Sequence, residues 1–386
     1  MRSWLALLPS LLLASACGIG RSAATEPVDP ATLTDLTPAV AATLAAEYPG
    51  VRVFLKGWGP EMPDEALPLR GLKSLTADAA AALAAYDKGP LLLDGLPALP
   101  VDTARALAGC RGGGLSLGGV AALTPEEARG LAGFRGQMMW LDGLEALPAD
   151  VARELAAFKG SGLTFGGLPM LAADAAAACA AFKGQVLSFG GLQALPVDVA
   201  EAVGGFGGVM LSLDGLKTLA PGAARGLARF KGESLTLDGL VAIDDDAAAA
   251  LAGFGGGRLR LDGLKTLSPA AVRALASDDG PLLHLDGLTT LTAETARILA
   301  GAKRWTGRLP GMTSLPADVA LELANFKGAG LRLDGLETLS PESAAGLARF
   351  AGKWLHLSGL ATLSADAAAA LVQFRGKGLY LRGLTA

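Results

Sequence analysis

The chain has 386 residues, of which 51% are hydrophobic, and its formal net charge is −4. A length of this size suits two or three ordinary domains, and the slightly acidic balance gives no indication of a nucleic-acid-binding protein. We therefore expect no nucleic-acid partner.

Residues 1–16 have the features of a secretory signal. Arg2 supplies a positive charge, and the apolar stretch that follows is too short to cross a bilayer. Ala14-Ser15-Ala16 before Cys17 resembles a bacterial lipoprotein lipobox, although that motif usually has a large aliphatic residue where Ala14 stands. The resemblance implies lipidation of Cys17 and a lipid-anchored protein of the cell envelope. Ordinary cleavage after Ala16, which would give a secreted protein, is the alternative.

Residues 17–30 are small and polar and predict a flexible tether. Residues 31–68 predict a divergent N-terminal cap, and residues 69–386 form a tandem array. Glycines recur in that array every 24 residues, beginning with Gly71, Gly95 and Gly119 and ending with Gly383. A fixed period of about 20 to 50 residues is typical of a solenoid, in which each unit packs against its neighbours.

Each unit of the array predicts one strand and one helix. Leu91 and Leu93 alternate as in a short strand, Asp94-Gly95 predicts a turn, and residues 102–108 have one apolar helical face. In other units a Ser or Thr before a proline predicts the helix start. Phe158-Lys159-Gly160 predicts a helix end with glycine as the terminating residue. Phenylalanines recur at the period and predict a buried, stacked spine.

This unit resembles the leucine-rich repeat family, through Leu91-x-Leu93 and through the period. The resemblance covers residues 69–386, about thirteen repeats, with no C-terminal cap. It implies an α/β solenoid, a curved array with parallel strands on the concave face and short helices on the convex face. The asparagine of the family consensus is replaced by Leu96 and its equivalents, so we expect Asp94-Gly95 and its equivalents to satisfy the turn instead.

Two sets of strand positions are predicted to face away from the core. Side chains alternate along a strand, so if Leu91 and Leu93 point inward, positions 90, 92 and 94 point outward. The positions equivalent to 92, here called the 92 row, are hydroxylic in the first half of the array and basic or aromatic in the second. With two residues from the 90 position, they predict a binding stripe for an acidic protein or glycan: Arg258, Arg260, His284, Arg308, Arg332, Trp354, His356 and Tyr380. An ordinary solvated face is the alternative.

The positions equivalent to 94, here called the 94 row, carry aspartates that repel one another. Four of them are consecutive, namely Asp214, Asp238, Asp262 and Asp286. Three arrangements would offset the repulsion: hydrogen bonds from turn N–H groups, pairing with Arg258 and Arg260, or a bound Ca²⁺. The hydrogen-bonded turn is the favoured interpretation.

The repeat pattern fails over residues 277–312. Asp278 replaces the spine phenylalanine, and the segment 303–310 loses a core leucine and the aspartate. Lys303, Arg304, Trp305 and Arg308 predict a contact patch if the irregularity is functional. Sequence drift is the alternative.

No motif for catalysis is present, so we expect no enzyme activity, no cofactor and no bound metal. The two histidines, His284 and His356, lie three repeats apart, about 14 Å, too far to share a metal ion. The sequence therefore predicts an interaction scaffold that binds through its concave face. The alternatives are a passive spacer, or an array that self-associates through the strand at Leu379 to Leu381.

Overall fold

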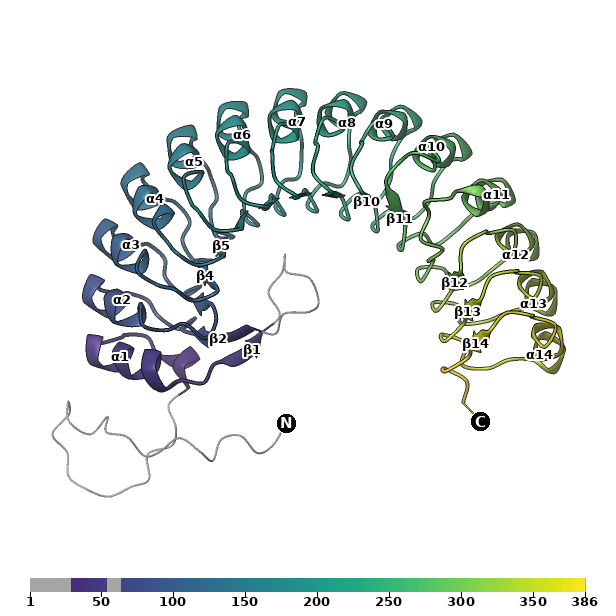
Figure 1. Ribbon diagram of the computed structural model, residues 1–386, viewed down its shortest axis with the longest axis horizontal. Helices are drawn as coiled ribbons and strands as arrows, with labels where there is room; N and C mark the ends of the chain where they lie inside the picture. Colours follow the sequence, from purple (N-terminus) through teal and green to yellow (C-terminus); the bar gives the residue numbers. More distant parts are fainter. Residues whose placement is uncertain (1–28, 54–63, 386) are drawn as a thin grey trace, which may run out of the picture. The chain divides into compact units, whose positions relative to one another are not determined.

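The computed structural model describes residues 29–53 and 64–385 (Figure 1). The expected signal at residues 1–16, Cys17 and most of the tether lie outside these ranges. The chain divides into two compact units, Met1–Gly167 and Leu168–Ala386, and each is described here by itself.

Unit 1 begins with an irregular segment and continues into repeats. It contains the 3-10 helix Pro30–Thr32, α1 Pro38–Glu47, and β1 Val51–Val53 paired antiparallel with β2 Asp64–Pro68. The strands then run parallel in chain order: β3 Leu91–Leu92, β4 Gly114–Ser116, β5 Met138–Trp140 and β6 Gly162–Thr164. The helices between them are α2 Ala77–Leu83, α3 Val101–Leu107, α4 Pro125–Ala132 and α5 Ala149–Leu155.

Unit 2 consists of repeats throughout. Its strands form two parallel groups: β7 Val186–Ser188, β8 Met210–Ser212, β9 Ser234–Thr236, β10 Arg258–Arg260 and β11 Leu282–His284, and then β12 Gly330–Arg332, β13 Trp354–His356 and β14 Gly378–Tyr380. Its helices are α6 Ala173–Ala180, α7 Val197–Gly204, α8 Pro221–Leu227, α9 Asp245–Leu251, α10 Pro269–Leu275, α11 Ala293–Gly301, α12 Ala317–Leu323, α13 Pro341–Leu347 and α14 Ala365–Leu371.

In each unit the strands form one layer, on the inner side of its curve, and the helices form the other (Figure 1). Strand residues pair with the residues one full period later, as in Leu211 with Leu235. This arrangement is the leucine-rich-repeat-like α/β solenoid that the sequence predicts.

The core between the layers is built from the expected apolar positions. Leu91 and Leu93 are fully buried, as are most of their equivalents along the array, whereas Leu379 and Leu381 in the last repeat are partly exposed. The predicted phenylalanine spine is confirmed: the rings of Phe206 and Phe230 stack at 6.1 Å with an interplanar angle of 4°. Phe230 and Phe254 stack in the same way at 6.0 Å. Each ring therefore fills the gap between successive helices and strands.

The glycine two residues after each spine phenylalanine has a different role from the one predicted. Among the residues that the structure describes, only Gly50 and Gly307 have a positive φ, so Gly160 is not a left-handed helix terminator. A Cβ atom on Gly160 would instead lie 2.1 Å from the ring of Phe158 and 2.6 Å from the carbonyl oxygen of Gly136. Glycine is required there because the ring folds back over its own backbone.

The helix starts agree with the sequence prediction. Thr124 accepts a hydrogen bond from the N–H of Glu127, and the Glu127 side chain accepts one from Thr124, which completes a capping box before Pro125. Ser268 and Ser340 cap α10 and α13 with their side chains, each before a proline. These caps satisfy N–H groups that the short helices leave free.

Candidate binding face on the strands

The 92 row faces away from the leucine core, and the structure brings its members side by side. Arg260 pairs in register with His284, and Arg332 pairs with His356. His356 in turn pairs with Tyr380, and an isolated bridge joins Arg308 to Arg332. Arg258 and Trp354 begin β10 and β13, on the same face.

Most of the first half of the 92 row is buried, although it faces away from the leucine core, and Ser188 is partly exposed. Ser116 and Thr164 are buried, and Trp140 is only 3% exposed. A Cβ atom on Gly114 would lie 2.2 Å from the indole of Trp140, so the ring lies over the preceding strand. The buried hydroxyls of Ser116 and Thr164 each bond to an aspartate of the 94 row.

The 94 row forms a ladder of hydrogen bonds between successive turns. Each of the aspartates named here accepts a bond through Oδ1 from the backbone N–H one full period later. In unit 1 Asp142 accepts from Gly166 at 2.6 Å. In unit 2 the consecutive bonds are Asp214 from Asp238, Asp238 from Asp262, and Asp262 from Asp286, each at 3.0 Å. The favoured interpretation of the aspartates is therefore confirmed.

The side chains of the 92 row bond to the same aspartates. Thr164 donates to Asp142 at 2.8 Å, and Ser212 donates to Asp214 at 2.8 Å. Where the row turns basic, an ion pair takes the place of the hydroxyl: Arg260 pairs with Asp238 at 2.9 Å and with Asp262 at 2.8 Å. Arg308 pairs with Asp286 at 3.0 Å, and Arg332 pairs with Asp334 at 3.4 Å.

These ion pairs change the electrostatic character of the predicted stripe. Arg260, Arg308 and Arg332 are each paired with an aspartate, so the face is a mosaic of paired charges and not a uniformly cationic surface. Half-exposed pairs of this kind contribute about 1 kcal/mol or less to stability. Attraction of a wholly acidic ligand is correspondingly weak.

Burial on this face shifts several pKa values. It raises the pKa of Asp238, even though the Asp262 N–H and Arg260 act in the opposite direction. Burial also lowers the pKa of His284, against the nearby Asp262 carboxylate, which raises it. Both shifts favour the neutral form of the group because charge is poorly solvated there.

Asp286 lacks the ladder donor that the other aspartates named above have. The residue one full period after Asp286 is Pro310, which has no N–H to donate. Oδ1 of Asp286 is therefore buried without a hydrogen-bond partner in the protein. Nε2 of the neighbouring His284 is likewise buried without one.

The buried polar atoms that lack a partner are concentrated in this region. Across residues 29–53 and 64–385, such side-chain atoms occur only between residues 234 and 306, in β9, β10, β11, the turn after β11 and the segment after α11. They belong to Ser234, Thr236, Arg260, His284, Asp286, Trp305 and Thr306. Because unpartnered buried polar atoms are rare in folded proteins, this clustering marks the region as a candidate site.

The irregular segment at 303–310 joins the two strand groups of unit 2. Leu283 bridges to Trp305 and not to Gly307, which stands one full period later, whereas Arg308 bridges to Arg332 at the usual spacing. Because Trp305 pairs two residues early, Thr306 and Gly307 are extra relative to the neighbouring strand and form a bulge, in which Gly307 has a φ of +71°. A Cβ atom there would lie 2.5 Å from the ring of Phe326, so glycine is required at this bulge.

The contact patch predicted at this segment is wrong for Trp305, which is buried and cannot contact a ligand. Trp305 is only 3% exposed, and its ring lies 4.8 Å from that of Phe326, at a tilt of 60°. Its indole therefore replaces the missing phenylalanine of the spine. Lys303 pairs with Asp278 at 2.5 Å, and Arg304 donates to the carbonyl oxygen of Gly257 at 3.4 Å.

An aromatic cluster lies on the strand face of β13 and β14. The rings of His356 and Tyr380 stack at 4.2 Å with an interplanar angle of 7°. The Trp354 ring lies 6.1 Å from that of Tyr380, and Trp354 is 36% exposed. The Arg382 guanidinium lies 5.6 Å from the centre of the Tyr380 ring. Unlike the phenylalanines of the spine, these rings are accessible to a ligand.

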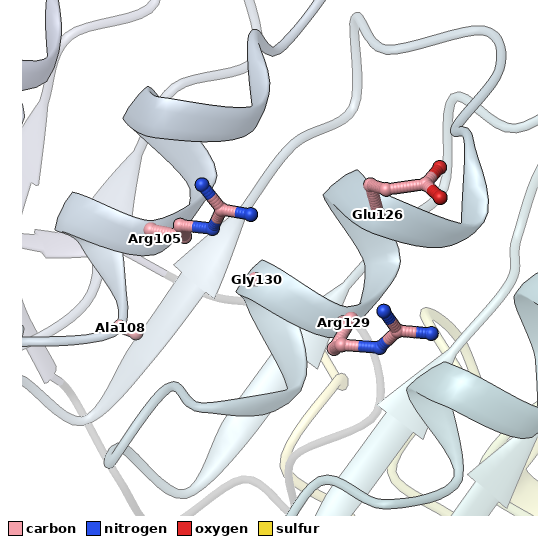
Figure 2. Close-up of a pocket in the computed structure, with 5 residues that line it drawn as sticks. All are labelled: Arg105, Ala108, Glu126, Arg129 and Gly130. Carbon is pink, nitrogen blue, oxygen red and sulfur yellow. The ribbon is translucent and has the colours of Figure 1, made fainter.

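The helix side offers one shallow pocket in unit 1. It is lined by Arg105 and Ala108 of the α3 end and by Glu126, Arg129 and Gly130 of α4 (Figure 2). Arg129 is paired with Glu154 through two hydrogen bonds, at 2.7 and 3.0 Å, and Arg105 is paired with Asp102. These pairs occupy its arginines, so the pocket has less to offer a ligand than the strand face.

Within the described ranges, no helix is both long and apolar enough to cross a membrane.

No protein-family model and no curated protein matches the sequence. Among solved structures, the chain is similar to a leucine-rich repeat protein of Leptospira interrogans, at 15% identity over 92% of this chain and 94% of that one, with a TM-score of 0.45. An internalin of Listeria monocytogenes is similar at 12% identity over 82% and 86%, with a TM-score of 0.42. A chain in the Toll–Spatzle complex of Drosophila is similar at 14% identity over 79% and 39%, with a TM-score of 0.42. The constant spacing between paired strand residues is itself the evidence that this chain has a leucine-rich-repeat-like fold.

Proposed function

We propose that the protein is a non-catalytic interaction scaffold of the bacterial cell envelope that binds a protein or a glycan through the strand face of unit 2. The observation that supports this most is the aromatic cluster of Trp354, His356 and Tyr380. The phenylalanines of the repeats are largely buried in the spine, whereas Trp354 is 36% exposed beside Tyr380. Exposed, mutually supported aromatic rings are typical of the centre of a binding surface.

The chemistry of this face favours a ligand with a flat apolar surface and mixed polar groups. Tyr380 stacks on His356 and has the Arg382 guanidinium close to its ring, so its movement is restricted before a ligand arrives. Because Arg332 is paired with Asp334, the flanking charge is balanced. A peptide side chain or a sugar ring that packs on Trp354 and hydrogen-bonds to the flanking groups fits these features.

The anchoring part of the proposal rests on the sequence alone. Cys17 is the proposed lipidation site, and it lies outside the described residues. Metabolic labelling with a palmitate analogue would test it: label should enter the wild-type protein and not the Cys17→Ser variant.

Binding is tested by presenting the immobilised protein with cell-envelope extract and with a glycan array. The strand-face variant Trp354→Ala/Tyr380→Ala should lose about 10-fold or more of the retained signal, since a central aromatic anchor contributes about 2 kcal/mol or more. The matched control, Leu321→Ala/Val372→Ala, removes two exposed apolar side chains from the helix side and should bind as the wild type does. Equal binding by all three proteins would exclude the strand face, and no retention by the wild type would favour a passive spacer.

A further inference from the structure

Three potential metal ligands meet on the strand face at the broken step of the aspartate ladder. Asp262, His284 and Asp286 each place one ligand atom within 4.8 Å of the others. They come from two successive turns: Asp262 follows β10, His284 ends β11, and Asp286 follows it. All three side chains are partly buried, and the ladder bond from the Asp286 N–H to Asp262 connects the two turns.

Two of these residues have a buried polar atom that lacks a hydrogen-bond partner in the protein. Oδ1 of Asp286 lacks the ladder donor because residue 310 is proline, and Nε2 of His284 has no partner. An unsatisfied buried polar atom costs about 1–3 kcal/mol, and here two such atoms belong to residues of one potential ligand cluster, which indicates that a ligand binds there. Oδ1 of Asp214 and Oδ1 of Asp238 each accept their ladder bond, so the missing donor is particular to Asp286 among the four consecutive aspartates.

We propose that Asp262, His284 and Asp286 bind one divalent transition-metal ion, of which Zn²⁺ is the best representative. A site with one imidazole and two carboxylates suits Zn²⁺, whereas Ca²⁺ and Mg²⁺ prefer oxygen ligands only. Three protein ligands leave a fourth position open toward the strand face, where a water molecule or a group from a partner can bind.

The neighbouring arginines are compatible with a bound cation. Arg260 pairs with both Asp238 and Asp262, so it keeps a partner when Asp262 coordinates metal. Arg308 bonds to Oδ2 of Asp286 and leaves Oδ1 available.

The same unit contains a natural comparison site with one ligand missing. Asp334, His356 and Ser358 occupy the positions equivalent to Asp262, His284 and Asp286. There the backbone N–H of Ser358 donates to Asp334 at 3.1 Å, and His356 stacks on Tyr380. With serine in place of the second aspartate, this site should not hold an ion.

The test is a calorimetric titration of the metal-free, full-length protein with Zn²⁺ in competition with a chelator, with Ca²⁺ and Mg²⁺ as comparisons. We expect one tight Zn²⁺ per chain. His284→Ala and the isosteric Asp286→Asn should each weaken binding by at least about 100-fold, the upper end of the range for outer-shell partners. His356→Ala should leave the affinity unchanged, and circular dichroism would confirm that each variant is folded.

Pro310→Ala tests the origin of the site. An alanine N–H at this position can complete the ladder to Oδ1 of Asp286, which should weaken Zn²⁺ binding by about 10-fold. Absence of stoichiometric Zn²⁺ binding in the wild type would overturn the proposal. So would a tight site that survives in both folded variants, His284→Ala and Asp286→Asn.

Discussion

Two adjacent glycines, Gly255 and Gly256, have opposite surroundings. A Cβ atom on Gly256 would lie 2.2 Å from the ring of Phe254 and 2.4 Å from the carbonyl oxygen of Gly232. A Cβ atom on Gly255 meets nothing within 4 Å. Gly256 is therefore a packing requirement of the spine, and Gly255 is free to vary.

We predict that Gly256→Ala destabilises the protein by about 1–3 kcal/mol, because the ring of Phe254 or the facing backbone must move. Gly255→Ala, one residue away, should change the free energy of unfolding by less than about 0.5 kcal/mol. Urea unfolding followed by circular dichroism compares the two. Equal effects would show that backbone flexibility, and not the ring contact, determines the cost.

His356 offers a prediction on pH. Burial lowers its pKa, as do the charges of Arg332 and Arg382, while Asp334 acts in the opposite direction. The folded pKa therefore lies below the ordinary value of about 6.5. The neutral form is the one favoured in the fold, so this contribution to stability is complete above that value and is lost as pH falls through the folded pKa.

An NMR titration of the His356 ring should accordingly have its midpoint below 6.5. Arg332→Gln should raise the midpoint by removing a nearby positive charge. Arg273→Gln, which removes an arginine from the helix side at α10, should leave it unchanged. A midpoint at or above 6.5 in the wild type would contradict the burial argument.

At the scale of the element, a turn that comes one period after a ladder aspartate depends on that carboxylate for a hydrogen bond. Asp142 accepts from the N–H of Gly166 and from the hydroxyl of Thr164. Asp142→Ala should cost about 0.5–1.5 kcal/mol, the ordinary net contribution of a hydrogen bond, because water can hydrate the freed N–H of Gly166 at this exposed position. Asp142→Asn keeps an acceptor oxygen and should cost less. Differential scanning calorimetry on both variants measures the difference, and equal losses would mean that charge matters and the hydrogen bond does not.

Much of this organisation follows from the sequence. The period predicted the strands and helices, the phenylalanines predicted the stacked spine, and the Asp-Gly pairs predicted the hydrogen-bonded turns. These features recur in every regular repeat, so a pattern that is ambiguous in one repeat can be recognised by comparison with the others.

What could not be predicted is what departs from the period. Trp305 stands three residues after Ala302, the equivalent of a spine phenylalanine, so aligning the repeats gives no sign that its ring enters the core. The pairing of Arg260 and Arg308 with the aspartates also depends on side-chain geometry across strands. The loss of a ladder donor was readable at Pro310, but only once the ladder itself was known.

At the scale of the whole molecule, the contacts that hold each unit together have a constant sequence spacing. Removing residues 215–238 from unit 2 deletes one full period, joins Asp214 to Gly239 and keeps every strand, ring and ladder residue in phase. Removing residues 215–237 shifts all later residues by one position, and a shift of one residue reverses the two faces of a strand.

We therefore predict that the deletion of one full period yields a soluble protein with cooperative thermal unfolding. The deletion that is one residue shorter should yield a protein with reduced helix content and low solubility. Circular dichroism and soluble yield distinguish the two. Similar behaviour of both deletions would show that neighbouring repeats do not specify each other's register.

The bulge at Thr306 and Gly307 carries a consequence for how this chain can diverge. The repeat that contains it has a longer helix than its neighbours, α11, followed by a strand segment that begins early, and Gly307 then absorbs the two extra residues. The early strand segment and the two-residue bulge cancel each other within one repeat, so the normal spacing is restored from Arg308 onward. The repeats that follow keep the normal register. Substitutions such as proline at position 310, which leaves Asp286 without its ladder donor, can therefore arise in this repeat without disturbing the packing of the others.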